Sequence, residues 1–210
     1  MRGTRLLAFE RRTLGALAGA ALACLAALAG AAGWAQGRST AGQLLVASDR
    51  MGDPRFVETV IYMIEHDRDG ALGLVVNRPL GDAPISALLE RLGFEPGSEE
   101  GDIAVHAGGP VEPGRAFVLH SADVMAEGSR AVDEVFAVSS RPGILRLIGQ
   151  GAGPKHSIFV FGYAGWGPGQ LDGELARADW FVIPAETALV FAPDPGQSWR
   201  EAVKRRAVEL

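Results

Sequence analysis

The chain of 210 residues has a single cysteine, Cys24, and it lies close to the N-terminus. The residues beyond it offer no disulfide, no thiolate nucleophile and no cysteine ligand for a metal. Histidine is scarce as well, with four residues in the chain. No pair of them has the spacing of a helical metal site, and the motif H-E-x-x-H is absent. We predict neither a metal site nor a cofactor, although histidines from different strands could still converge.

The motifs of common nucleophilic and nucleotide-binding enzymes are also missing. There is no G-x-S-x-G, so no serine stands on a nucleophile elbow. Gly108-Gly109-Pro110 follows an expected strand, but it lacks the lysine of a phosphate loop and the third glycine of a dinucleotide fingerprint. Paired glycines at a strand end more often permit close backbone packing, although such a corner also lets a small ligand approach. We predict no catalytic residue.

The chain has fewer basic than acidic side chains. The chain carries 25 acidic and 20 basic side chains, a formal net charge of −5. Four arginines and one glutamate fall within residues 1–35, so the remaining chain stands at −8. Nucleic acid repels such a domain unless basic residues are concentrated on one face. The one candidate, Lys204-Arg205-Arg206, lies where a charge run usually forms a solvated helix end, so direct nucleic-acid binding is not expected.

The N-terminus has the pattern of an export signal. A stretch with four arginines precedes an uncharged, alanine-rich run from Thr13 to Gly33, and Gly33-Trp34-Ala35 approximates a cleavage site. We predict a signal segment over residues 1–35, a linker over 36–42 and one domain over 43–210. Export to the periplasm follows if the leader is genuine, whereas a mis-assigned start codon would leave the protein cytoplasmic. A permanent membrane span is not favoured, because alanine and glycine insert weakly.

The composition is that of a globular protein, with 48% apolar and 21% charged residues. Val57–His66 and Ala71–Val76 are rich in strand-forming residues and flank the turn sequence Asp67–Gly70, which predicts a hairpin. Apolar residues at i, i+3, i+4 and i+7 from Ile85 to Leu92 predict a helix, with Pro84 near its start. Strands and helices alternate irregularly, which favours an α+β fold with a largely antiparallel sheet.

One stretch organises the second half of the chain. Ser157–Trp166 is expected as a buried strand that runs into a glycine-rich corner and then a short helix around Leu171. Aromatic rings on such a corner usually pack across the end of a sheet and less often line a pocket. Ala131–Val138 is expected as one further strand, and Ser198 with Glu201 forms a capping box for the last helix.

Polar and glycine-rich motifs lie at the ends of several expected strands, where binding sites are commonly built. Arg78, at the exit of the hairpin, could grip a carboxylate or phosphate, or form a structural salt bridge. Glu65 and His66 are adjacent in a strand and face opposite sides, which argues against an acid–base pair. We expect the strand exits to share one surface that binds a small molecule or a protein. The candidate ligand-binding residues are His66, Asn77, Arg78, Gly108, Gly109, Pro110, His120, Trp166 and Gln170.

Six segments, taken in order, resemble the YqgE/AlgH family, also called DUF179 or UPF0301. They are M-G-D-P-R-F (Met51–Phe56), E-H-x-x-x-G-A-L-G-L-V-V-N-R-P (Glu65–Pro79), G-G-P-V (Gly108–Val111), F-V-L-H-S (Phe117–Ser121), G-Y-A-G-W-G-P-G-Q-L (Gly162–Leu171) and W-R-E-A (Trp199–Ala202). The resemblance covers about Gly42 to Val208. It implies a single α+β domain of coiled sheets with flanking helices, and no established reaction. A role in transcriptional regulation, linked to alginate production, is attached to the family name.

The chain departs from the family pattern in three places. Ile64 stands where relatives often carry a cysteine, which excludes a thiol role there. Ser48-Asp49 replaces a common Met-Pro, and a hydrophobic leader is unusual because relatives are mostly regarded as cytoplasmic.

Three functions remain in view. The preferred one is a non-catalytic binding or regulatory accessory module that uses the surface between Asn77–Pro79, Gly108–Val111 and Trp166. The second is a transcriptional regulator, direct or indirect, and an acidic, exported domain argues against the direct form. The third is a hydrolase-type enzyme with His66 or His120 as base, which would have to meet an arginine or a metal in one pocket. The sequence favours a protein without enzymatic activity.

Overall fold

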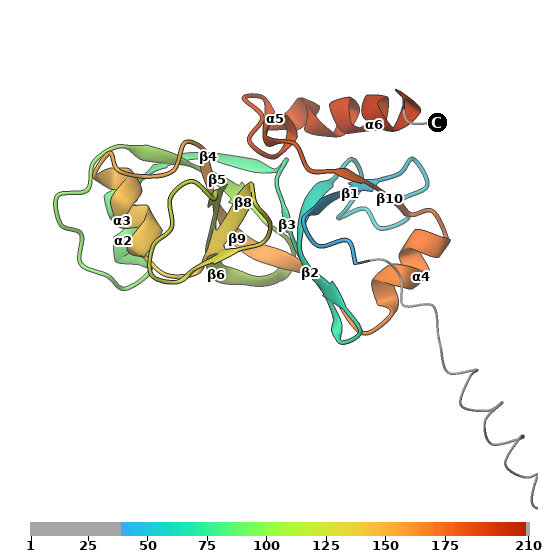
Figure 1. The fold of residues 1–210 in the computed structure, drawn as a ribbon, viewed down its shortest axis with the longest axis horizontal. Helices are drawn as coiled ribbons and strands as arrows, with labels where there is room; N and C mark the ends of the chain where they lie inside the picture. Colours follow the sequence, from blue (N-terminus) through green and yellow to red (C-terminus); the bar gives the residue numbers. More distant parts are fainter. Residues whose placement is uncertain (1–38, 209–210) are drawn as a thin grey trace, which may run out of the picture. The chain divides into compact units, whose positions relative to one another are not determined.

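Strand β9 (Ser157–Trp166) pairs with three neighbours and joins the two parts of the sheet. In the computed structural model, whose described residues are 39–208, its first part lies between β5 (Asp102–Ala107) and β6 (Val111–Ser121). Its last three residues pair with β3 (Gly70–Val75). The β5–β9 pair is parallel, and the other strand pairs of the described residues are antiparallel (Figure 1). The predicted α+β fold, a single compact domain with a largely antiparallel, curled sheet and flanking helices, is confirmed.

The strand order is β10–β1–β2–β3–β9–β6–β8–β7, and β4 extends the sheet beyond β5. The remaining strands are β1 (Gln43–Ala47), β2 (Val60–Asp67), β4 (Pro79–Pro84), β7 (Ser129–Ala131), β8 (Phe136–Ser139) and β10 (Trp180–Pro184). The helices are α2 (Ile85–Arg91), α3 (Gly143–Gly149), α4 (Gln170–Ala176), α5 (Thr187–Val190) and α6 (Ser198–Val208), with a 3-10 turn, η1, at Pro195–Gln197. The predicted hairpin is β2–β3, and the predicted helix is α2.

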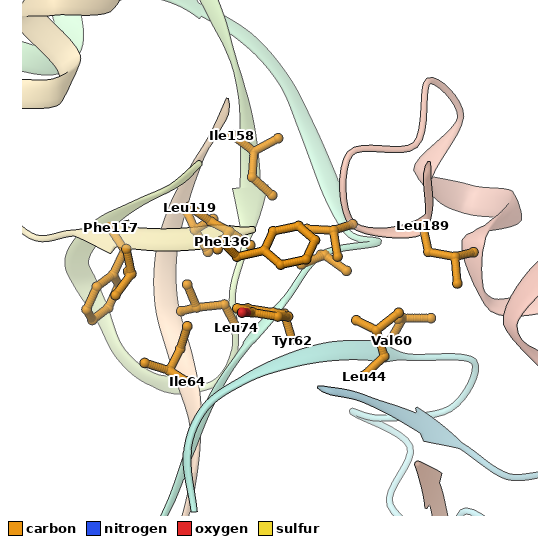
Figure 2. Close-up of a cluster of buried hydrophobic side chains, with 14 of the residues drawn as sticks. Leu44, Val60, Tyr62, Ile64, Leu74, Phe117, Leu119, Phe136, Ile158 and Leu189 are labelled. Carbon is orange, nitrogen blue, oxygen red and sulfur yellow. The ribbon is translucent and has the colours of Figure 1, made fainter. Parts of the chain in front are cut away.

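Strands β1 and β2 are buried on both faces, because alternate side chains along a strand enter different cores. Leu44 and Tyr62 belong to a central core with residues of β3, β6, β8 and β9 (Figure 2). Leu45 and Ile61 point the other way, into a second core that contains Trp166. The two faces explain why these strands are almost continuously apolar.

The helices cover these cores in separate groups. Helices α5 and α6 close the central core through Leu189 and Ala202, and α4 covers the second core through Leu171. Helices α2 and α3 lie side by side over a third core, against β5, β6 and β9 (Figure 1). Helix α4 therefore lies on the opposite face of β1 and β2 from α5 and α6.

Glycine is required where β9 meets the Gly108-Gly109 corner. Gly109 has a φ of 149°, and a Cβ there would collide with the Tyr163 carbonyl group. Gly162 has a φ of 71°, and its Cβ would lie 2.6 Å from the Gly109 carbonyl oxygen. A Cβ at either position would prevent this close approach of the two backbones, so both positions require glycine.

The expectation of one strand over Ala131–Val138 is wrong. The structure has two short strands, β7 and β8, because Asp133 turns the chain between them. Its Oδ1 accepts hydrogen bonds from the amides of Val135 and Phe136, both at 2.7 Å. An aspartate that bonds its own following backbone in this way favours a turn over an extended strand.

Two further features differ from the sequence prediction: strand β4 was not predicted, and the cap before the last helix was assigned to the wrong residue. β4 contains two prolines and a glycine, and it is tolerated as a strand because it pairs on one side only, with β5. Ser198 does not cap α6 in a capping box, since its hydroxyl donates to the Leu189 carbonyl at 3.4 Å. The turn η1 precedes α6, and Asp194 caps it by accepting from the Gly196 amide.

The first described residues are hydrogen-bonded to strand β2. Ser39 donates to the His66 carbonyl at 2.8 Å, and the Gly42 amide donates to the Met63 carbonyl at 2.9 Å. Residues 39–42, assigned to a linker by the sequence, thus lie against the end of β2. The expected signal segment, residues 1–35, lies outside the described residues. Between residues 39 and 208, no helix combines the length and apolar character needed to cross a membrane.

Candidate functional site

Two tryptophans from different elements are held by one carboxylate. Trp166 ends β9 and Trp180 begins β10, and both indole Nε1–H groups donate to Oε2 of Glu174, at 2.9 and 2.8 Å. The other carboxylate oxygen of Glu174 accepts from Gln170 at 2.9 Å. Glu174 and Gln170 are one turn apart on α4, so a single helix orients both rings. Hydrogen bonds to an ionised acceptor are strong, which makes this arrangement rigid.

The tryptophans form the floor of a cleft of about 380 Å³, called the tryptophan cleft below. Phe56 packs edge-to-face on Trp180 at 5.6 Å between ring centroids, and Trp166 does so at 6.1 Å. The walls come from the loop Arg50–Phe56 and from the corner at Pro110-Val111. The aromatic floor is held in place by these contacts, and charged side chains of both signs line the rest of the cleft.

Arginines surround the opening of the tryptophan cleft. Arg55 is paired with Asp53 at 2.6 Å and Arg177 with Asp179 at 2.8 Å. The hydrogen bonds from Arg55 hold the pKa of Asp53 below its usual range. Arg50 is exposed, and its side chain has no ion pair or hydrogen bond with any residue of the described range 39–208. The cleft thus offers an aromatic floor beside an unpaired guanidinium.

The sequence places nine candidate residues in one site, and the structure brings three of them into this cleft: Pro110, Trp166 and Gln170. Asn77 and Arg78 have other partners. The Asn77 amide group bonds the Val60 amide and the Glu58 carbonyl, and Arg78 donates to the Val57 carbonyl at 2.8 Å. Both side chains fasten the segment that leads into β2, which is a structural role.

Gly108 and Gly109 adjoin the cleft without lining it. The Val75 amide donates to the Gly108 carbonyl, and the Ala107 amide donates to the Arg78 carbonyl, both at 2.9 Å. The exits of β3 and β5 are therefore neighbours, as the sequence predicts. Close backbone packing accounts for both glycines, and their contribution is to place Pro110 at the wall of the cleft.

The two candidate histidines belong to separate networks. His66 Nδ1 lies 3.1 Å from Thr40 Oγ1, and its Nε2 lies 3.8 Å from Asp172 Oδ1. His120 is fully buried, with Nδ1 2.9 Å from the Ser121 carbonyl oxygen and Nε2 2.9 Å from Ser139 Oγ. Burial lowers the pKa of His120, which favours the neutral form of the ring. Neither histidine contacts Arg78, and the described residues contain no group of three His, Cys, Asp or Glu side chains that could hold a metal.

Comparison with known proteins identifies the family of the chain. A family model described as DUF179, AlgH-like, matches residues 44–210. The chain belongs to this family. UPF0301 proteins of Methylococcus capsulatus and Sphingopyxis alaskensis are 43% and 46% identical to it, over 171 and 168 residues. The alignments cover 81% and 80% of this chain, and 93% and 89% of the relatives.

Two solved structures of similar proteins agree with the fold. The AlgH protein from Pseudomonas aeruginosa superposes with a TM-score of 0.68 at 35% identity, over 81% of this chain and 90% of that one. A protein from Corynebacterium diphtheriae, at 22% identity, has a TM-score of 0.64 over 81% of this chain and 88% of its own. The second likeness shows the fold alone. The family is uncharacterised, so membership assigns no reaction.

Within this AlgH-like domain, sequence reasoning missed Arg50, Phe56, Glu174 and Trp180 as parts of one cleft. Met51–Phe56 resembles a family segment, but no local pattern connects it with residues more than a hundred positions later. One available signal was the spacing of Gln170 and Glu174 just after Trp166, which is helical. It places a carboxylate one turn above the corner, where an indole N–H needs an acceptor.

Proposed function

We propose that this AlgH-like protein is a non-catalytic binding module and that the tryptophan cleft receives a peptide segment of a partner protein. The observation that carries the proposal is the pair of indoles fixed on Glu174 beside the unpaired Arg50. Tryptophan and arginine are the side chains most enriched where binding energy concentrates in protein interfaces. A rigid floor also lowers the entropy lost on binding.

The cleft indicates what the peptide carries. Its aromatic floor suits a large aromatic or aliphatic side chain, and Arg50 suits a carboxylate beside it. The arginines Arg55 and Arg177 already have carboxylate partners, which leaves Arg50 as the group whose charge a ligand can satisfy. We expect an acidic residue next to a bulky apolar one.

A peptide-display selection on the purified domain tests this function. We expect enriched peptides to share an acidic residue next to an aromatic or large aliphatic one. Arg50→Glu should weaken their binding by about tenfold or more, because it removes the cation and adds a repulsive charge. Arg68→Glu is the matched control, since its side chain is 81% exposed on the β2–β3 turn and lies outside the cleft. Peptides that bind both variants equally, or a selection without this pattern, would refute the proposal.

Direct regulation of transcription finds less support. The basic run near the C-terminus is engaged with neighbours: Lys204 pairs with Glu201 at 2.7 Å, Arg205 pairs with Glu186 at 3.1 Å, and Arg206 lies over the Phe181 ring. An acidic domain whose one basic run is already partnered has little concentrated positive charge with which to neutralise phosphates. Any regulatory role would then act through a protein partner held in the cleft.

The hydrolase alternative is also weaker. His120 needs a substrate within reach, but its ring is enclosed and hydrogen-bonded on both nitrogens. His66 has Thr40 on one nitrogen, and the carboxylate of Asp172 lies beyond hydrogen-bond distance of the other. A general base must lie within about 3 Å of the atom that bears the proton it removes, and neither ring lines the cleft.

A further inference from the structure

Strand β10 is an edge of the sheet. It pairs with β1 on one side, and no other strand of residues 39–208 pairs with it. Natural proteins usually blunt such edges with charges, prolines, bulges or very short strands. The other two edges of the described sheet follow this rule, because β4 contains two prolines and a register shift, and β7 has three residues. Strand β10 has five residues, W-F-V-I-P, with no charge and with a proline only at its end.

The hydrogen-bond pattern shows which backbone groups of β10 point away from β1. The Ser48 amide donates to the Asp179 carbonyl at 2.9 Å, and the register continues with Val46 opposite Phe181. Bonded and non-bonded pairs alternate along an antiparallel ladder, so Phe181 bonds to β1, while the N–H and C=O of Val182 face the outer side. Within residues 39–208 neither of these two groups has a hydrogen-bond partner, and Val182 is partly exposed.

The outer side of β10 leads into the tryptophan cleft. Trp180, on the floor of the cleft, is the first residue of β10, and its side chain lies on the same face of the strand as that of Val182. Arg50 follows Ala47, the β1 residue opposite Trp180, by three positions, which places it at this end of β10. A peptide extended along β10 therefore runs from the exposed Pro184 to the aromatic floor and then to the guanidinium.

On the basis of the proposed function, on which this binding mode depends, we infer that the partner's peptide segment adds to β10 as an antiparallel strand. Val182 exchanges two backbone hydrogen bonds with one peptide residue, and the Pro184 carbonyl accepts from the amide two residues earlier in the peptide. The peptide residue opposite Trp180 shares a face with the indole, so its bulky side chain lies on the aromatic floor. The acidic residue that follows it meets Arg50. Antiparallel addition thus fixes the order of the motif: an extended stretch, then the bulky residue, then the acid.

A peptide fits this edge better than a second copy of the domain does. Two copies of β10 that pair about Val182 set Trp180 opposite Pro184, which has no N–H, so the outward carbonyl of Trp180 stays unpaired. Both copies also carry a net charge of −8 outside residues 1–35 and repel each other. A peptide brings an N–H to each position, and its acidic residue meets a cation.

Backbone N-methylation of the tightest-binding peptide from the display selection tests this binding mode. Methylation two residues before the bulky residue removes the donor to the Val182 carbonyl, and we expect binding to the full chain to weaken about tenfold or more. Methylation directly before the bulky residue is the matched control, because that amide points away from β10, and it should change the affinity by less than about twofold. In the selected peptides, the acidic residue should follow the bulky one.

Amide hydrogen exchange on the full chain gives an independent measurement. With the unmodified peptide at saturation, the Val182 amide should exchange about tenfold more slowly or less, while Phe181, already bonded to β1, serves as the reference. Equal binding of the two methylated peptides, or unchanged Val182 exchange while the cleft indoles shift, would overturn strand addition and leave the proposed function standing. The reverse order of bulky and acidic residues would also overturn it. A selection without any binding peptide would refute both, and protection of Val182 that rises with protein concentration alone would show that a second copy occupies the edge.

Discussion

Replacing Glu174 by alanine tests the account of the tryptophan cleft through stability. The change removes the acceptor of two indole N–H groups and one amide N–H, at 2.9, 2.8 and 2.9 Å. A buried donor left without a partner costs about 1–3 kcal/mol, and Trp166 and Trp180 are only 7% and 3% exposed. Gln170 can turn to water, so it adds little. For the two indoles together, we therefore expect Glu174→Ala to lower the free energy of unfolding by about 2–6 kcal/mol.

Urea unfolding followed by circular dichroism measures this loss, which corresponds to roughly 4–24 °C in melting temperature for a domain of this size. Glu174→Gln is the control, because its amide oxygen still accepts from the indoles, and it should lose about half as much or less. Proton NMR of the indole Nε1–H groups reports whether the bonds persist. A Glu174→Ala protein within about 0.5 kcal/mol of wild type would refute the role of Glu174, since that is the range of neutral surface changes.

Further predictions concern other parts of the domain. His106 and His120 have pKa values lowered by burial, so the unfolded chain binds more protons than the folded one below the ordinary value of 6.5. The free energy of unfolding should fall as the pH drops through that value, and it should fall less steeply in His106→Phe. Urea titrations that give the same free energy of unfolding across this pH range would contradict this. Gly109→Ala should cost about 2 kcal/mol or more in the same assay, because its Cβ would strike Tyr163, and an unchanged midpoint would contradict the close packing. Gel-shift titrations at low salt should detect no specific DNA binding, and a steep salt dependence would contradict the assignment of Lys204–Arg206 to partnered surface charges.

Much of the fold follows from local patterns in the sequence. The β2–β3 hairpin and α2 are encoded by a turn sequence and by helical periodicity, both of which act over a few residues. The errors come from single side chains that override a pattern, such as Asp133, which divides one expected strand into β7 and β8. β4 was missed because edge strands tolerate proline, and an edge cannot be recognised before the pairing is known.

The sequence predicts some of the residues that line the tryptophan cleft and misses others. Trp166, Gln170 and Pro110 follow from the glycine-rich strand exits, and the structure brings them together in one cleft. Arg78 had two interpretations, and it holds the segment before β2 through backbone and hydroxyl contacts, with no carboxylate involved. Trp180 and Arg50 could not be assigned to the cleft from the sequence, because they come together through the pairing of β1 with β10, which are far apart in the sequence. Contacts between segments so distant in sequence depend on the whole topology.

Chemical-shift mapping of a selected peptide on the domain tests whether the tryptophan cleft is the peptide-binding site. The indole Nε1–H signals of Trp166 and Trp180 report on the floor of the cleft, and that of Trp199, which donates to the Ala47 carbonyl at 2.7 Å, serves as an internal reference. The first two signals should move on titration while the third stays, and in Arg50→Glu the same movement should need about tenfold more peptide or worse. A peptide that binds tightly while both cleft indoles stay in place would contradict this.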